Sequence, residues 1–443
     1  MRIAYIAAGA AGMYCGSCLH DNTLAAALLD LGEDVVLVPT YTPIRTDEED
    51  VSYRRVFFGG INVYLQQTLP LFRYTPQWFD RMLDHPALLN SLSKRSGSVD
   101  PTKLGAMTVS MLRGEEGNQR KELRKLADWL LNEVQPDVIH LSNVMFMGMA
   151  RLFNRRFGPP IVCSLAGEDA FLERLTPPYY EQARSLLRER ARDVDAFVSL
   201  NRYYADRMTA YLSVSPDKVH VIPHGLRLDG HGTRIAPVDG RPQVVGYLAR
   251  VCHDKGLHVL AEACELLAAD PATPRFELWV AGYLGAAERK YLDEIDRRAK
   301  AGQMAGRMRY HGELDRLEKI AFLRQLDVFS LPSVHPEAKG LPVLEAWANA
   351  VPAVLPAHGS FPEMVKDTGG GLLHEPANPR HLAERLAECL ADPGRAAELG
   401  LAGQNAVRER YHAELMALRT RDLYLQLCQR QQTVSEVDQP ATR

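Results

Sequence analysis

The sequence predicts an α/β protein with two doubly wound domains in tandem, each built on a parallel sheet covered by helices. Short apolar segments rich in β-branched residues alternate with longer helical patterns, which is typical of parallel βαβ units. This alternation occurs twice, before and after a stretch at residues 224–242 that is rich in Gly, Pro, Arg and Asp and lacks apolar periodicity. The 443 residues, 46% of them hydrophobic, suffice for two cores.

The first domain is expected over residues 1–223, with a helix at about Thr23–Leu31. Its strands are expected at 2–8, 34–40, 137–142, 160–165, 196–201 and 218–223. An insertion around 53–118 is longer than a strand-to-helix connection requires. A helical lid and a substrate-specific element explain this insertion equally well.

The second domain is expected over residues 243–410, after a linker at 224–242. Its strands are expected at 243–249, 276–282, 307–312, 328–332 and 352–356, with helices such as 257–269 and 317–326 between them. A C-terminal helix at 411–428 would pack back on the N-terminal domain. Residues 429–443 are polar and aperiodic, which predicts a disordered tail.

Composition excludes several classes of protein. The formal charge is −3, from 52 basic and 55 acidic side chains, so no bulk attraction to nucleic acid or anionic membranes is expected. Seven cysteines, from Cys15 to Cys428, fit neither a disulfide framework nor a four-ligand zinc module, and indicate the cytoplasm. The apolar N-terminus leads into a Gly-rich loop and a helix, so it is interpreted as a strand and not as a signal peptide. No apolar run approaches the roughly 20 residues of a membrane-spanning helix.

A pair of basic residues follows the first strand of the second domain. Arg250 comes directly after this strand, and Lys255 and Gly256 precede the next helix. Parallel sheets bind ligands at the carboxyl ends of their strands, and a helix N-terminus favours anions. The guanidinium fork and the ammonium therefore suit a diphosphate, although two solvated basic residues in a loop would explain the position equally well.

A pair of acidic residues follows a later strand of the same domain. Glu337 lies on a loop, and Glu345 lies in the first turns of the following helix, in which Pro342 suits the first turn. Carboxylates there can accept hydrogen bonds from sugar hydroxyls, while amides near Gly340 and Leu341 meet phosphate. The alternative for Glu345 is a favourable interaction with the helix dipole and no ligand.

Together these motifs resemble the retaining glycosyltransferases of the GT-B fold, which include bacterial mannosyltransferases and relatives of glycogen synthase. The resemblance lies in GYLAR, DKG, the E-x7-E spacing, GSFPEMV and GGGLLHEP, and in the first half in the loop Gly9–Gly16 and HLSN. It implies two Rossmann-like domains that face a central cleft. It also implies that Arg250 and Lys255 bind the donor diphosphate, that Glu345 binds the ribose and that Glu337 binds the donor sugar. Further donor-binding residues are expected at Gly12, Gly16, Leu314, Gly340 and Leu341.

The sequence departs from this family pattern at two places. Relatives commonly carry a histidine after the strand at 160–165, where this chain has Ala166, so the resemblance assigns no histidine to the acceptor side. Glu168 or Asp169 would take over part of the role, but both are also suited to cap the helix that follows. The second departure is His224–Gly225, where many relatives have Asn-Gly.

Three other signals receive structural interpretations. Asp193 and Asp195 form a D-x-D at the end of a helix, where helix termination explains them better than a metal. Cys15 and Cys18 form a C-x-x-C without a second Cys/His pair, so structural or ligand-lining thiols are favoured over a metal or redox centre. Histidines such as His140 and His311 are expected in the core or at strand ends.

These observations predict a metal-independent, retaining glycosyltransferase without a cofactor. Its donor would be a UDP-, GDP- or ADP-sugar, and its acceptor a glycan, a lipid or a small molecule. If the acceptor is a lipid, the 53–118 insertion would contact the inner face of the membrane. A nucleotide-sugar epimerase or hydrolase and a non-catalytic nucleotide-sugar-binding protein are the alternatives.

Overall fold

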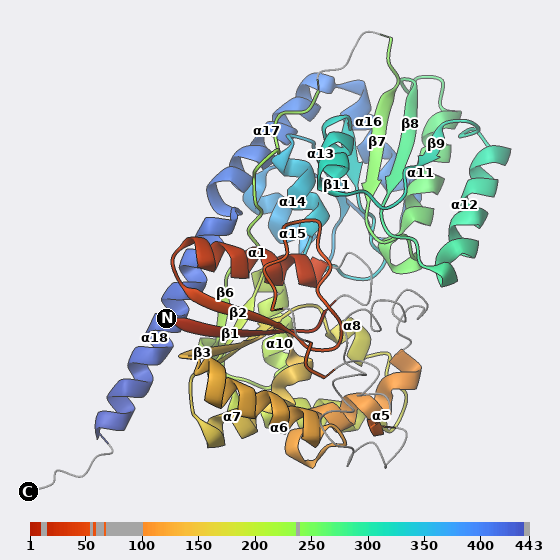
Figure 1. Ribbon diagram of the computed structural model, residues 1–443. Helices are drawn as coiled ribbons and strands as arrows, with labels where there is room; N and C mark the ends of the chain where they lie inside the picture. The colour runs from red at the N-terminus through yellow and green to blue at the C-terminus, as the bar shows by residue number, and fades with distance from the viewer. Residues whose placement is uncertain (10–15, 54–55, 59–65, 68–100, 236–239, 438–443) are drawn as a thin grey trace, which may run out of the picture. The chain divides into compact units, whose positions relative to one another are not determined.

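The computed structural model describes the chain in two compact units (Figure 1). Unit 1 comprises residues 1–225 and 413–443, and unit 2 comprises residues 226–412. Residues 10–15, 54–55, 59–65, 68–100, 236–239 and 438–443 lie outside the described part of the chain. The proposed 53–118 insertion falls mostly in this part, so its lid-like or substrate-specific role stays a prediction.

Unit 1 is built on a six-stranded parallel sheet with the order β2-β1-β3-β4-β5-β6. Its strands are β1 Arg2–Ala7, β2 Asp34–Pro39, β3 Val138–Leu141, β4 Ile161–Leu165, β5 Ala196–Ser199 and β6 Val219–Val221. Its helices are α1 Gly16–Asp30, α5 Pro101–Leu112, α6 Arg120–Trp129, α7 Ala150–Arg156, α8 Asp169–Leu172, α9 Tyr179–Arg190, α10 Arg202–Leu212 and α18 Ala413–Val437. The strands lie where the apolar runs of the sequence predict them, because both faces of a parallel sheet are covered and its strands are apolar throughout.

Unit 2 contains a second parallel sheet of six strands, with the order β12-β11-β10-β7-β8-β9. Its strands are β7 Gln243–Leu248, β8 Phe276–Ala281, β9 Met308–Tyr310, β10 Val328–Ser330, β11 Ala353–Pro356 and β12 Gly371–His374. Its helices are α11 Leu257–Ala269, α12 Arg289–Ala301, α13 Arg316–Arg324, α14 Leu341–Ala348, α15 Phe361–Thr368, α16 Pro379–Ala391 and α17 Pro393–Arg410. The two sheets confirm the predicted doubly wound α/β class.

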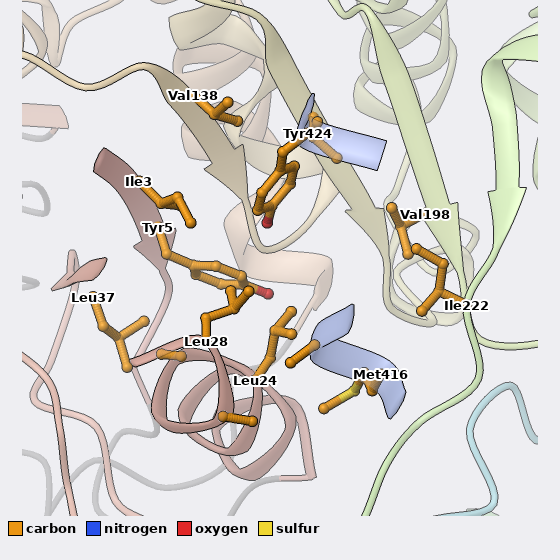
Figure 2. Close-up of a cluster of buried hydrophobic side chains, with 14 of the residues drawn as sticks. Ile3, Tyr5, Leu24, Leu28, Leu37, Val138, Val198, Ile222, Met416 and Tyr424 are labelled. Atoms are coloured by element: carbon orange, nitrogen blue, oxygen red, sulfur yellow. The ribbon is translucent and has the colours of Figure 1, made fainter. Parts of the chain in front are cut away.

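The C-terminal helix α18 completes the core of unit 1 (Figure 2). Met416 and Tyr424 of α18 lie among Tyr5 of β1, Leu28 of α1 and Val138 of β3. The Tyr424 hydroxyl also forms a hydrogen bond with His140 of β3. Helix α18 is therefore an integral part of unit 1, although the whole of unit 2 separates it in sequence from the rest of that unit.

The predicted disordered tail at 429–443 is wrong over its first part, because α18 continues to Val437. Disorder was predicted because the polar side chains of this segment cannot form a hydrophobic core. The first part of α18 is formed because its apolar face packs against α1. Each residue added to an existing helix gains one backbone hydrogen bond, so the helix extends beyond its buried part.

The chain passes between the units twice, at Leu226 and at His412. The Leu226 N–H donates to the Tyr411 carbonyl oxygen at 2.8 Å, and Leu226 forms a parallel bridge with His412. After the first crossing, Arg234 and Arg241 form ion pairs with the buried carboxylate of Asp327. The described part of the segment predicted as a linker is therefore fastened to unit 2.

Candidate functional site

Arg250, Lys255, Glu337 and Gly340, four of the predicted donor residues of unit 2, lie on loops at one edge of its sheet. Strand β10 pairs in parallel with both β7 and β11, so the carboxyl ends of the three strands lie side by side. The loops that follow them are residues 249–256, 331–340 and 357–360. Ligands of doubly wound folds bind at such an edge.

Two glycines allow these loops to approach one another closely. Gly256 has φ +73, and a Cβ atom there would lie 1.8 Å from the carbonyl oxygen of Pro332. Gly359 has φ +65, and its Cβ would lie 2.5 Å from the amide nitrogen of Glu337. Any side chain at either position would push the neighbouring loop away, because these distances are far below van der Waals contact. Gly256 therefore allows the Lys255 loop to approach the Glu337 loop, and Gly359 allows the 357–360 loop to approach Glu337.

Hydrogen bonds hold the three loops in place. The Val334 N–H donates to the Asp254 carbonyl oxygen at 2.9 Å, and the Ser333 hydroxyl donates to the same oxygen at 3.0 Å. His358 Nε2 donates to the Ser333 carbonyl oxygen at 2.8 Å, which requires the proton on Nε2. Burial lowers the pKa of His358, so its ring is neutral at pH 7. The loop after β10 is thus hydrogen-bonded both to the loop after β7 and to the loop after β11.

At the centre of these loops the Lys255 ammonium forms an ion pair with Oε2 of Glu337. The side chains are 27% and 13% exposed, so a ligand can still reach them. Burial would raise the pKa of the Glu337 carboxyl, but the Lys255 charge and hydrogen bond and the Lys339 N–H outweigh burial, and the pKa is lowered. Glu337 is therefore an ionised acceptor, and Lys255 is the cation that keeps it so.

Arg250 lies on the first of these loops, on the exposed side. Its carbonyl oxygen accepts a hydrogen bond from the buried Tyr247 hydroxyl at 3.2 Å. Burial raises the pKa of this Tyr247 phenol, the Arg250 charge lowers it and the Glu337 charge raises it, so both charges act on one hydroxyl. Arg250, Lys255 and Glu337 thus lie on neighbouring loops of unit 2, and the binding functions that the sequence assigns to them stay predictions.

Helix α14 begins beside these loops. Gly340, with φ +68, is its N-cap residue and Pro342 lies in its first turn. Glu345 is buried in the second turn, where its carboxylate forms an ion pair with the Lys319 ammonium of α13. Leu341 is the first helical residue, and Leu314 lies half-buried on the loop before α13. The functions predicted for Gly340, Leu341, Leu314 and Glu345 stay predictions.

In unit 1, the Glu168 carboxylate accepts hydrogen bonds from the loops that follow β3 and β4. Its Oε1 atom accepts the Val144 N–H at 3.0 Å, and its Oε2 atom accepts the Ala166 N–H at 2.8 Å. Glu168 is the N-cap residue of α8, but its side chain makes no capping hydrogen bond, so the cap interpretation is wrong for this side chain. The reason is that the amides of the neighbouring loops point toward the carboxylate.

Asp169 also has partners inside unit 1. Its carboxylate accepts the Tyr204 hydroxyl at 2.8 Å and forms an ion pair with Arg207 at 2.5 Å. Together with Glu168, it joins the ends of β3 and β4 to α10. Both carboxylates thus have a structural function in the described contacts, and their predicted function on the acceptor side is untested.

The remaining motifs divide into structural groups and residues outside the described ranges. Asp193 pairs with Arg151 at 3.1 Å, and Asp195 accepts the Ile161 N–H at 2.7 Å, in agreement with their structural interpretation. Gly12 and Cys15 lie outside the described residues, Gly16 starts α1, and Cys18 of α1 is buried.

Sequence reasoning missed two lysines of unit 2. Lys319 lies in the middle of a helix, 26 positions before Glu345, and only the fold brings the two together. The Lys339 N–H donates to Oε1 of Glu337 at 3.4 Å, and the charge of Lys339 also lowers the pKa of that carboxyl. The short distance in sequence between Lys339 and Glu337 was a usable signal for the second lysine. No signal in the sequence identified the first.

Two Rossmann-like domains, with cationic and acidic side chains on the strand ends of the second, define the class of GT-B glycosyltransferases. Solved structures share this fold. Sucrose-phosphate synthase from Thermosynechococcus elongatus superposes with a TM-score of 0.69 at 19% identity, covering 96% of this chain and 98% of that one. HepE from Anabaena, in complex with UDP-glucose, gives a TM-score of 0.64 at 15% identity over 96% and 99%.

Family models place the chain within this class. Residues 22–225 match the glycosyl transferase 4-like domain, and residues 234–406 match the glycosyl transferases group 1 model. The chain belongs to this glycosyltransferase family.

Curated relatives of this family match over part of the chain. The D-inositol 3-phosphate glycosyltransferase of Xylanimonas cellulosilytica is 30% identical over 252 residues, which are 53% of this chain and 58% of that protein. The alpha-maltose-1-phosphate synthase of Mycolicibacterium smegmatis is 27% identical over 330 residues, 67% of this chain and 80% of that protein. Among the described residues, no helix combines the length and the apolar character that crossing a bilayer requires.

Proposed function

We propose that the protein transfers a sugar, with retention of anomeric configuration, from a nucleoside diphosphate to an acceptor hydroxyl. The observation that supports this most directly is the Lys255–Glu337 ion pair at the strand ends of unit 2. In this pair a cation suited to phosphate contacts a carboxylate suited to sugar hydroxyls, and the names of the relatives and of the solved neighbour describe proteins that act on sugars.

The difficult part of this reaction is the charge on the leaving group. As the glycosidic bond breaks, negative charge grows on the diphosphate and positive character grows on the sugar ring. Arg250 would bind two phosphate oxygens through its planar fork. Lys255 carries three donors, so it can hold Glu337 and still donate to phosphate. Fixed cations at this point stabilise the transition state more than mobile water does.

The remaining residues would orient the donor. Glu337 would accept hydrogen bonds from the sugar hydroxyls, and Glu345 from the ribose. The amides at Gly340 and Leu341 begin α14, and a helix N-terminus favours the negative charge of a phosphate. The acceptor hydroxyl would attack from the face that the diphosphate leaves, with a diphosphate oxygen taking its proton.

Metal independence is part of the proposal, because Arg250 and Lys255 supply the positive charge that a divalent ion supplies in other transferases. Turnover should therefore persist in EDTA. Arg250→Ala and Lys255→Ala should each lower kcat by about 10²-fold or more in EDTA, as expected for loss of a group that stabilises transition-state charge. Unchanged turnover in both variants would refute the assignment.

The donor and the stereochemistry need their own measurements. A thermal-shift panel of UDP-, GDP- and ADP-sugars should identify one donor class, because a ligand that binds only the folded state raises the melting temperature. Product NMR with that donor should show retained configuration. Incubation with donor alone, without acceptor, should give little release or isomerisation of the sugar, and rapid conversion would indicate a hydrolase or an epimerase instead.

A further inference from the structure

The carboxylate proposed to bind the ribose has a partner that the sequence motifs do not include. Lys319 Nζ on α13 forms an ion pair with Oε1 of Glu345 on α14, and the two side chains are only 10% and 6% exposed. We propose that Lys319 is a positioning residue for the donor: it keeps the Glu345 carboxylate ionised and oriented to accept the hydroxyls of the nucleotide ribose. This inference rests on the proposed function and deepens it.

The chemistry of the carboxylate explains why it needs a cation. An ionised carboxylate only accepts hydrogen bonds, on about four lone-pair positions, whereas a protonated one also donates. Both hydroxyls of a ribose can donate to it. Burial favours the neutral form of a carboxyl group, and a cation within hydrogen-bond distance reverses that preference. With its ammonium on Oε1, Lys319 keeps the buried group in the acceptor form.

Helix α13 is fixed at both ends, so Lys319 is held in place. Asp315 and Glu318 form a capping box at its start. Arg316 Nη2 donates to the Arg227 carbonyl oxygen at 2.8 Å, and Arg324 Nε donates to the Thr233 carbonyl oxygen at 3.2 Å. A lysine side chain has many rotamers, and a rigid, buried setting removes most of them before the ligand binds.

Helix α14 is fastened to the same segment of the chain. Asn349 Nδ2 donates to the Glu345 carbonyl oxygen at 2.9 Å, and Asn349 Oδ1 accepts the Gly232 N–H at 3.2 Å. The two helices that carry the ion pair are thus bound to residues 227–233. This shared support holds the two helices that carry the ion pair to one segment of the chain.

Stability alone gives a weaker account of the pair. A buried ion pair is often no more stabilising than apolar residues of similar volume. Ile320 and Leu344, the neighbours of Lys319 and Glu345 in sequence, are buried and apolar, so both charged residues occupy buried stretches of their helices. A function for the carboxylate explains why two charges occupy this place.

The test measures how strongly the protein prefers ribose to deoxyribose. Calorimetry gives the Kd of whichever of UDP, GDP and ADP binds most tightly, and of its 2′-deoxy counterpart. In the unmodified protein, loss of a hydroxyl bound by an ionised carboxylate should weaken binding at least about tenfold. Lys319→Gln should reduce this preference to within about threefold, as should Glu345→Gln. Lys319→Arg should restore most of it.

A matched control separates this positioning from a general loss of stability. Lys125 in α6 of unit 1 forms an equally buried ion pair with Glu122, with side chains 8% and 0% exposed. Lys125→Gln should lower the melting temperature in a similar way, yet leave the ribose preference unchanged. If Lys319→Gln does not fold, the double variant Lys319→Gln/Glu345→Gln is compared with the single variant Glu345→Gln. Neither of these two variants leaves the Glu345 carboxylate buried without a cation. Lys319 acts through Glu345, so adding Lys319→Gln to Glu345→Gln should change Kd less than about twofold.

The outcomes separate this inference from the function on which it rests. A preference that disappears in Glu345→Gln but persists in Lys319→Gln would overturn the role of Lys319 and leave the donor site intact. Further loss of affinity on adding Lys319→Gln to Glu345→Gln would also overturn it, because Lys319 would then contact the donor itself. Absence of any nucleoside diphosphate binding to the unmodified protein would overturn the proposed function, and this inference with it.

Discussion

Lys255 and Glu337 are 82 positions apart in the sequence, yet their charged groups are in direct contact at the strand ends of unit 2. Their loops can meet because Gly256 has no Cβ atom, which would collide with the Pro332 carbonyl of the Glu337 loop. The contact joins a side chain suited to phosphate to one suited to sugar hydroxyls. Its electrostatics and its steric basis can each be tested.

The first prediction concerns acid stability. The pKa of Glu337 is lowered in the folded protein from 4.5, so its ionised form stabilises the fold above pH 4.5, and that contribution is lost as pH falls through the folded value. The difference in unfolding free energy between the unmodified protein and Glu337→Gln should be constant from pH 7 to about 5.5. It should shrink below pH 4.5. Chemical denaturation followed by circular dichroism measures it, and a difference that grows on acidification would reverse the assigned sign.

The second prediction concerns Gly256. In Gly256→Ala the new methyl group would collide with the Pro332 carbonyl, so the Lys255 loop should shift and donor affinity should fall at least tenfold. Gly306 is a matched control, because it has φ +74 and a Cβ atom added there would meet nothing within 4 Å. Gly306→Ala should lower the free energy of unfolding by only about 1–2 kcal/mol, which is the cost of an alanine in the left-handed conformation, and should leave donor binding unchanged. Equal donor affinity in the two variants would contradict the steric argument.

The third prediction concerns His140, which is fully buried beneath α18. Burial lowers its pKa from 6.5 to about 3. Below pH 6.5 the His140 side chain is protonated in the unfolded chain but stays neutral in the folded chain. The free energy of unfolding therefore decreases as the pH is lowered. Between pH 7.5 and 5.0 this one group should account for about 2 kcal/mol, which His140→Gln should remove from the pH dependence. Parallel pH profiles of the two proteins would show that His140 does not titrate as proposed.

The fourth prediction concerns Tyr424 of α18. Tyr424→Ala removes a fully buried ring from the core of unit 1 and should cost about 3–5 kcal/mol. Tyr424→Phe loses only the hydrogen bond with His140 and should cost about 1–3 kcal/mol. The next residue, Leu425, is 43% exposed, and Leu425→Ala should stay within about 0.5 kcal/mol. Thermal unfolding measures all three, and a small effect of Tyr424→Ala would mean that α18 is not part of the core.

The sequence predicted most of this fold because apolar runs mark the strands of a covered parallel sheet. Strand β12 was not identified as a strand, since it begins within the run Gly369–Gly371, and glycine weakens the strand signal. The acidic and basic pairs were predicted because each follows a strand that the pattern had already located. Lys319 was not predicted, because nothing in the sequence distinguishes it from other lysines on helices. Only the packing of α13 beside α14 brings it to Glu345.

The paired crossings at Leu226 and His412 make unit 2 an insertion within unit 1, with its two ends joined by a backbone hydrogen bond. An inserted domain whose ends already touch loses little on excision. Residues 226–412, produced alone or closed by a short glycine-containing loop, are therefore the segment to express for a test of nucleotide binding without an acceptor. The remaining sequence offers no such option, because unit 1 needs both of its separated pieces to assemble one core.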